Sequence, residues 1–199
     1  MKWFDAQIGI ENTGILNGKG YTPSQMGSAS HPFYNASPVD GAVVFNDQLF
    51  HVPLLYDVFR DVLVVSHLSA SGRGWFIHLE KELVDGFEMA GHYFRNYDRG
   101  FHEVLFEGKN LALVAKRNKI SQLKNRIYNY IKNDRYFVID DGDWRLITGK
   151  SRLIKLLNGK ADQKELKKFM KQNRIKVRRH NDTDLVKVME FINGKRIKT

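Results

Sequence analysis

The chain has no cysteine, four prolines in 199 residues, and no apolar run of the roughly 20 residues that a membrane-spanning helix needs. Without cysteine there are no disulfides, thiolate metal sites or cysteine nucleophiles. The absence does not choose a compartment, because exported bacterial proteins also lack cysteine. The N-terminus has no apolar stretch before a small-residue cleavage site. We therefore expect either a cytoplasmic chain or one whose leader was removed before residue 2.

Charge is present but unevenly distributed. The net charge is +10, yet residues 1–110 carry 8 Lys/Arg against 13 Asp/Glu, whereas residues 111–199 carry 24 against 9. A non-specific nucleic-acid binder is more often basic over its whole folded surface. A polarised chain of this kind favours a protein that docks on an anionic partner.

Three regions differ in texture, and they predict the domain organisation. Residues 1–40 are rich in Gly, Pro, Ser and Asn and indicate a loop-rich lead-in, pinned to the body by Tyr21, Phe33 and Tyr34. Residues 41–149 consist of short β-like runs separated by turn residues. Residues 150–199 form a basic C-terminal module of amphipathic stretches.

These patterns predict an α+β fold, in which an antiparallel β-meander curls into an open barrel or half-barrel and two or three short helices follow. Asp141-Gly142 between two β-like runs is a hairpin signal, because Gly tolerates a positive φ. Apolar residues at helical spacing leave residues 118–134 open between a helix and a long excursion between strands.

The C-terminal helices carry recognisable end signals. Ser151 is the expected cap of the first, and Asp162 with Glu165 resembles a capping box for the second. Asp182 or Thr183 is expected to cap the third. Asn-Gly pairs at 158–159 and 193–194 are the expected helix stops.

The most basic segment is KADQKELKKFMKQNRIKVRR, residues 160–179, in which only Asp162 and Glu165 oppose nine Lys or Arg. Burying unpaired ammonium groups is costly, so we expect the cations on the outer faces of the helices and the apolar stripe inward. Either this is simply a solvated face, or it binds a partner. The candidate partner-binding residues are Lys164, Lys167, Lys168, Lys171, Arg174, Lys176, Arg178 and Arg179.

Motifs for chemistry are not apparent in the sequence. The seven histidines lack the H-x-H or H-x3-H spacing of metal ligands, and no G-x-S-x-G elbow is present. We therefore predict no catalytic residues, no metal site and no cofactor, and a protein that is not an enzyme.

Several stretches together resemble an uncharacterised family of exported proteins from Bacteroidetes-type bacteria. They are the HPFY element at 31–34, the VPLLYD segment at 52–57, the FHEVLFEGKNLALVAKR hairpin at 101–117, and the tail at 150–177. The segment SGRGWFIHLEKELVDGF is only loosely similar. The resemblance implies a periplasmic, outer-membrane-associated location, with the leader removed.

The function expected from these observations is that of a non-enzymatic accessory or subunit protein of an outer-membrane protein assembly, which docks through the basic C-terminal surface. Its partner would be a protein at the outer membrane, with anionic lipid or peptidoglycan as alternatives. A second hypothesis is a lipid or small-ligand carrier with a cavity walled by Trp75, Phe76, Phe87 and Phe94. A third, which the resemblance disfavours, is nucleic-acid binding through the basic helices.

Overall fold

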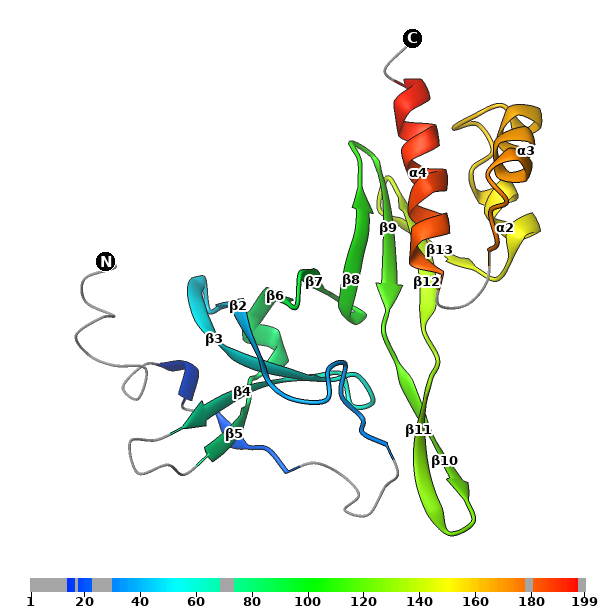
Figure 1. Cartoon of the computed structure of the whole chain (residues 1–199). Coiled ribbons are helices and arrows are strands. Elements are labelled where there is room, and N and C mark those ends of the chain that lie inside the picture. The colour runs from blue at the N-terminus through cyan, green and yellow to red at the C-terminus, as the bar shows by residue number, and fades with distance from the viewer. Residues whose placement is uncertain (1–13, 17, 23–29, 69–73, 178–180, 197–199) are drawn as a thin grey trace. The chain divides into compact units, whose positions relative to one another are not determined.

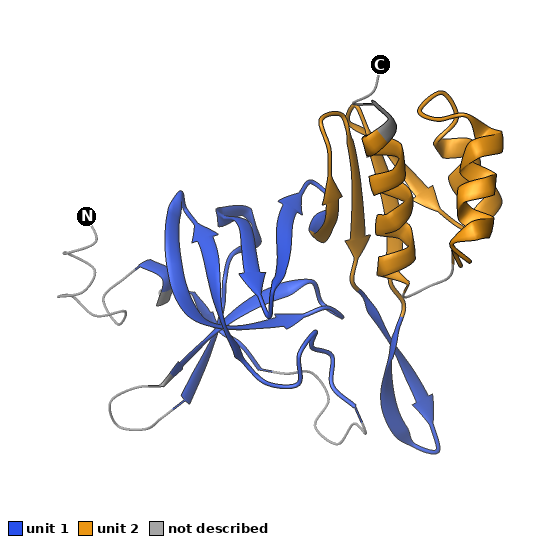
Figure 2. Cartoon of the chain, turned by 45° about the horizontal axis from the view of Figure 1, so that its top comes forward, with its two compact units in different colours: residues 1–101, 118–132 blue, residues 102–117, 133–199 orange. Residues whose placement is uncertain are grey.

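The computed structural model describes residues 14–16, 18–22, 30–68, 74–177 and 181–196. The chain divides into two compact units, one of residues 1–101 with 118–132, the other of residues 102–117 with 133–199 (Figure 2). The fold class is α+β with antiparallel strands and three C-terminal helices, as the sequence predicts (Figure 1). None of the helices within the described ranges combines the length and apolar character needed to cross a bilayer.

Unit 1 is built from strands and two short 3-10 turns. Its elements are η2 (Gly14–Leu16), β1 (Lys19–Gly20), β2 (Val39–Phe45), β3 (Gln48–Asp57), β4 (Val62–Leu68), β5 (Gly74–His78), η3 (Lys81–Leu83), β6 (Val84–Met89), β7 (His92–Tyr97), β10 (Lys119–Lys124) and β11 (Ile127–Lys132). The strand order is β1-β5-β4-β3-β2-β6-β7, and β10 with β11 forms a separate two-stranded sheet. Among the described strands β1 does not pair with β7, so the sheet is open rather than a closed barrel.

The core of unit 1 contains a cluster of aromatic rings among aliphatic side chains. Phe87 and Phe94 stack with ring centroids 4.7 Å apart, and Tyr56 meets both rings edge-on. Phe101 packs against the same rings. Phe87 of β6 lies directly opposite Phe94 of β7, and directly opposite residues of paired strands point to the same face, so the strand register brings these two rings together.

The lead-in is held to unit 1 as expected. The Tyr21 N–H donates to the Phe76 carbonyl at 2.7 Å, and the Tyr34 N–H donates to the Tyr56 carbonyl at 2.8 Å. The Tyr21 hydroxyl donates to the buried Asp57 carboxylate at 2.6 Å. Burial and that carboxylate both raise the pKa of Tyr21 above its ordinary range.

Unit 2 places helices on a small antiparallel sheet. Its elements are β8 (Gly100–Glu107, whose first two residues precede the boundary), β9 (Leu111–Lys116), β12 (Arg135–Asp140), β13 (Asp143–Ile147), α2 (Lys150–Leu156), α3 (Gln163–Gln172) and α4 (Asp182–Arg196), with strand order β8-β9-β12-β13. The predicted boundary between residues 149 and 150 falls inside this unit, because one face of β9 and β12 shares an aliphatic core with all three helices. Asp141 and Gly142 form the predicted turn, both with positive φ.

Residues 118–134 are a β-hairpin, so the helical alternative was wrong. Ile120 lies opposite Ile131, and Leu123 lies opposite Tyr128. Asn125 and Arg126 form the turn with φ of 51° and 64°, the left-handed conformation that two-residue hairpin turns require. Apolar residues three and four apart fit a helix, but here they divide between the two faces of a ribbon.

Three predicted helix ends were also wrong. Asp182 and Thr183 lie within α4, and the side chain that accepts a hydrogen bond at its start, from the Asp184 N–H at 3.4 Å, is that of Asn181. The N-cap of α2 is Gly149, with no side-chain cap, and Ser151 lies within the helix. Asn193 and Gly194 lie inside α4, which continues to Arg196. Tertiary packing of Ile192 in the core holds this last stretch helical despite the low helix propensity of Asn-Gly.

Candidate functional site

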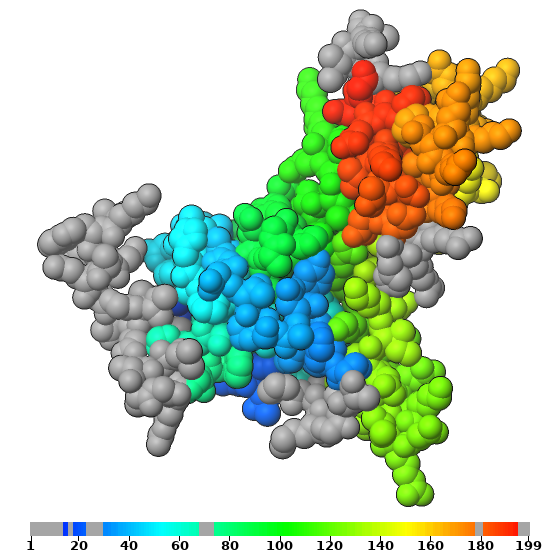
Figure 3. All heavy atoms as spheres, in the orientation of Figure 1, coloured from blue at the N-terminus to red at the C-terminus, as the bar shows by residue number. Residues whose placement is uncertain are grey.

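The candidate site is the outer face of α3 in unit 2. Lys164, Lys167, Lys168 and Lys171 are spaced i, i+3, i+4 and i+7, and all four are exposed. At 100° per residue this spacing places them on one side of the helix. The rise of about 1.5 Å per residue spreads them over roughly 10 Å of its length. We call these four residues the lysine stripe; in Figure 3 the side chains of α3, coloured orange, project from the surface of unit 2.

The opposite face of α3 fixes this orientation. Leu166 and Met170 are fully buried among the helices and sheet of unit 2. Phe169 stacks on Phe191 of α4 with ring centroids 4.1 Å apart. Rotating the helix to hide the lysines would expose this apolar face, so the cations are turned to water as the sequence predicts.

The start of α3 is fixed by its cap. The Asp162 carboxylate accepts hydrogen bonds from the N–H groups of Lys164 at 2.8 Å and Glu165 at 2.9 Å. An Asp N-cap satisfies donors that the helix leaves open, and its charge suits the positive end of the helix dipole. The first part of the predicted capping box is therefore confirmed.

The lysine stripe differs from the neighbouring Lys160 in its electrostatic surroundings. Lys160 is largely buried and pairs with Asp140 at 2.5 Å, where its charge is neutralised. Within the described residues, no carboxylate lies within 4.0 Å of an ammonium group of the stripe. Its charges are thus left for a partner or for solvent.

The remaining predicted partner-binding residues continue from α3. Arg174 and Lys176 are exposed. The Lys176 N–H donates to the Asp184 carboxylate at 2.8 Å, and this hydrogen bond is the main reason that the pKa of Asp184 is lowered. Arg178 and Arg179 lie outside the described residues.

A second cationic feature of unit 2 lies at the start of α2. A shallow hollow of about 390 Å³ is lined by Thr148, Gly149, Lys150, Ser151, Arg152 and Lys155. The lining combines three cations with two hydroxyl groups and has no carboxylate. The chemistry of α2 therefore matches that of the lysine stripe, since both offer hydrogen-bond donors and positive charge to an anion.

A buried charge network holds α4 to the sheet of unit 2. The Arg117 guanidinium pairs with Glu103, with Asp134 at 3.0 Å and with Asp182 at 2.6 Å. The Tyr136 hydroxyl donates to Asp182 at 2.7 Å. Burial opposes the charge on Arg117, but its hydrogen bonds to Asp182 and Glu103 raise its pKa, which keeps it protonated. The network positions α4, on which α3 rests, and it has no reactive group of its own.

The predicted cavity-wall residues divide between the core and the surface of unit 1. Phe87 and Phe94 stack inside the filled core of unit 1. Trp75 and Phe76 lie on β5 with 56% and 37% of their surface exposed. The hollows described in this section are lined by other residues.

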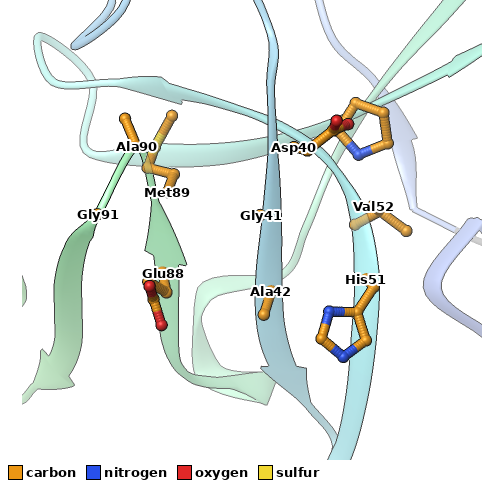
Figure 4. A pocket seen from close by; sticks show the side chains of 10 residues that line it. Asp40, Gly41, Ala42, His51, Val52, Glu88, Met89, Ala90 and Gly91 are labelled. Carbon is orange, nitrogen blue, oxygen red and sulfur yellow. The ribbon is translucent and has the colours of Figure 1, made fainter.

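Unit 1 does have a shallow hollow, which the sequence did not predict. It has about 450 Å³ and lies over Gly41 and Ala42, with His51, Glu88 and Asp40 around its rim (Figure 4). Ala42 presents only a methyl group to the hollow, whereas the neighbouring Gly41 faces the core, where a Cβ would come within 2.8 Å of the buried Leu54 side chain. Ala42 pairs with His51 on one neighbouring strand and with Glu88 on the other, which places both side chains at the rim of the hollow. The sequence alone does not show this strand register.

Groupings suited to metal chemistry do not occur in the described ranges: no three His, Asp or Glu side chains there converge as metal ligands. His102, for example, packs edge-on against Trp144 in unit 2, with ring centroids 4.9 Å apart. This is an aromatic role rather than a ligand role.

Comparisons with protein-family models, with curated proteins and with solved structures found no match. The functional argument therefore depends on the geometry of the surfaces just described.

Proposed function

We propose that this protein is a non-enzymatic docking protein that binds an acidic protein partner through the lysine stripe of α3. One observation carries the proposal. Lys164, Lys167, Lys168 and Lys171 share one helix face, and no described carboxylate of the chain neutralises them. Because the array lies on a capped, well-packed helix, binding needs no ordering of the backbone that carries it, which favours recognition over loose charge attraction.

The hollow at the start of α2 supports the same proposal. Lys150, Arg152 and Lys155 add cations on the helix that precedes the stripe in the same unit. Lysines act as point charges towards carboxylate and phosphate alike, but the sequence has no helix-turn-helix spacing, RNP-like aromatic strand or zinc motif to accompany them. An acidic protein surface therefore fits better than nucleic acid.

Export to the periplasm and association with an outer-membrane assembly are part of the proposal. They rest on the sequence resemblance alone. Cell fractionation of the full gene product tests the location independently of the binding surface.

The binding test compares two variants of equal charge change. Lys167→Gln, Lys168→Gln and Lys171→Gln together remove three cations from the stripe. The control Lys109→Gln, Arg135→Gln and Lys187→Gln removes three exposed cations elsewhere in unit 2. We expect affinity for a polyglutamate probe, measured by calorimetry at low salt, to fall about tenfold or more in the first variant and about twofold in the control.

Equal losses in the two variants would mean that net charge alone attracts the probe, and the proposal would be abandoned. Tighter binding of duplex DNA than of polyglutamate, lost in the stripe variant, would replace it with nucleic-acid binding. In cells, cross-linking to an envelope protein that is lost only in the stripe variant would extend the result to a natural partner.

A further inference from the structure

The β10–β11 hairpin of unit 1 has the densest exposed apolar surface in the described part of the chain. Twelve large apolar side chains are exposed among all the described residues, and five of these twelve lie in β10 and β11. They are Ile120, Leu123, Ile127, Tyr128 and Ile131, each 42–58% exposed. Isolated exposed apolar residues are ordinary, but a cluster of this kind marks an interaction surface.

The base of the hairpin is firmly anchored. The Lys119 ammonium is buried and donates to the carbonyl groups of Phe33 at 2.6 Å and His31 at 2.9 Å. The Tyr130 N–H donates to Ser30 Oγ at 2.6 Å, and the Tyr130 ring packs edge-on against Phe59 at 5.2 Å. A two-stranded hairpin has only marginal stability alone. These contacts at its base therefore stabilise the whole ribbon.

Apolar groups occupy both faces of the ribbon towards its turn. Leu123 lies directly opposite Tyr128, so both are on one face. Ile127 lies opposite Lys124 and points to the other face, the one that also carries Ile120 and Ile131. A groove on a protein would cover one face, whereas an interfacial lipid layer surrounds a tip on both.

The charge of the hairpin selects among apolar partners. Residues 119–132 contain no Asp or Glu, and Lys124, Arg126 and Lys132 are exposed. A second copy packed hairpin to hairpin would oppose like charges, which is unfavourable. An anionic lipid surface instead attracts each cation while its headgroup region accepts isoleucine, leucine and tyrosine.

We propose that the β10–β11 hairpin binds anionic membrane surfaces, inserting Leu123, Ile127 and Tyr128 to headgroup depth. It does not cross the bilayer, because its unpaired strand edges need water or headgroups as hydrogen-bond partners. The site is separate from the lysine stripe and does not depend on the proposed function. The ligand is a phospholipid headgroup layer of negative charge.

Vesicle co-sedimentation of the full chain tests the proposal. The vesicles contain either equimolar phosphatidylglycerol and phosphatidylcholine or phosphatidylcholine alone. We expect binding to the anionic vesicles to fall at least about tenfold in Leu123→Thr/Ile127→Thr/Tyr128→Thr, which keeps every charge and uses a good strand former. The matched control is Leu49→Thr/Leu83→Thr/Tyr93→Thr, three exposed apolar residues elsewhere in unit 1, with binding within about twofold of the original.

Charge variants separate this site from the lysine stripe. Lys124→Gln/Arg126→Gln/Lys132→Gln should also lose about tenfold. Lys167→Gln/Lys168→Gln/Lys171→Gln should retain binding within about twofold. The reverse pattern, with loss only in the α3 variant, would overturn the hairpin proposal and assign lipid binding to the stripe. Binding that is equal on both vesicle types, or absent from both, would also overturn it, as would a dimer that the tip variant converts to a monomer without any effect on vesicles.

The cysteine-free chain allows a direct measure of depth. An environment-sensitive fluorophore on Gln122→Cys should gain intensity and shift to the blue on anionic vesicles. The same label on Gln48→Cys, an exposed glutamine beside the β2–β3 turn, should not change. An equal response at both positions would contradict insertion by the hairpin, whatever the result for the lysine stripe.

Discussion

The two units hold a buried charge in opposite ways. In unit 1 the Asp57 carboxylate is fully buried and accepts hydrogen bonds from the Tyr21 hydroxyl and from the N–H groups of Phe59 and Arg60. In unit 2 the Arg117 guanidinium is buried among carboxylates from β8, from the residue before β12 and from the start of α4. The anion is thus satisfied largely by a local turn, whereas the cation joins segments that are far apart in the sequence.

The hydrophobic cores of the two units also differ in the side chains that fill them. Unit 1 buries aromatic rings between the strands of a bent sheet, where large flat groups fill the interior. Unit 2 buries aliphatic side chains between a sheet and three helices, where leucine, isoleucine and methionine interdigitate. We therefore expect the stability of unit 1 to be most sensitive to its ring cluster, and that of unit 2 to Arg117, which connects its layers.

The largest expected effect is in unit 2. Arg117→Ala removes the cation that pairs with the buried carboxylates Glu103 and Asp134, which should lower the free energy of unfolding by about 4 kcal/mol. The three α-helices of the described chain all lie in unit 2, so urea unfolding followed by the helical circular dichroism signal reports on it. Arg117→Lys, which retains charge with fewer donors, should lose less. A loss below about 1 kcal/mol for Arg117→Ala would show that the network contributes little to stability.

A somewhat smaller effect is expected from the ring cluster of unit 1. Phe94→Ala removes a fully buried ring that stacks on Phe87 and should cost about 3 kcal/mol. Tyr93→Ala, on the exposed side of the same strand, serves as the control and should cost about 0.5 kcal/mol or less. Unfolding monitored by aromatic near-ultraviolet circular dichroism checks both, and equal costs would contradict the proposed role of the aromatic core.

The smallest expected effect concerns pH in unit 1. Burial, and next the nearby Lys119 ammonium, lower the pKa of His31. The unfolded chain binds a proton at the ordinary imidazole pKa of about 6.5, and the folded chain binds it only at lower pH, so stability is present above that value and falls below it.

The urea midpoint of unit 1 should therefore decline modestly from about pH 7.5 to about pH 5.5. This decline should be reduced in His31→Gln. The protection of the Lys119 and Tyr130 amides against hydrogen exchange, expressed relative to the intrinsic exchange rate at each pH, should fall over the same range in the original chain. An identical pH profile for His31→Gln would assign the decline to other groups.

Local signals predicted much of unit 2 and of its candidate site. The Asp162 cap and the alternation of apolar and basic residues in α3 are set within one helical turn, and both were confirmed. The inward residues of α4 follow the same 3.6-residue period: Leu185, Val188, Met189 and Ile192 are all buried. In both helices, the residues that form the buried apolar stripe lie within a few positions of one another in the sequence, so their spacing alone predicts which face is buried.

Features that depend on long-range pairing were not predicted. The apolar spacing in residues 118–134 fits a helix and a hairpin equally, and the structure differs because Asn125 and Arg126 adopt a left-handed turn and the base contacts Ser30 and Phe59. The hollow over Gly41 and Ala42 depends on the register of three strands. The partners of Arg117 lie up to 65 residues away.

By itself the sequence determined the antiparallel strands, the Asp162 cap of α3 and the outward lysines, because turn residues, caps and hydrophobic periodicity act over a few residues. The tertiary structure alone decided that four strands join the helices in one unit, that a solitary arginine is surrounded by acids, and that a basic apolar hairpin is held at its base. Those outcomes follow from which distant segments bury surface together, and the free energy of that burial belongs to no single stretch of the chain.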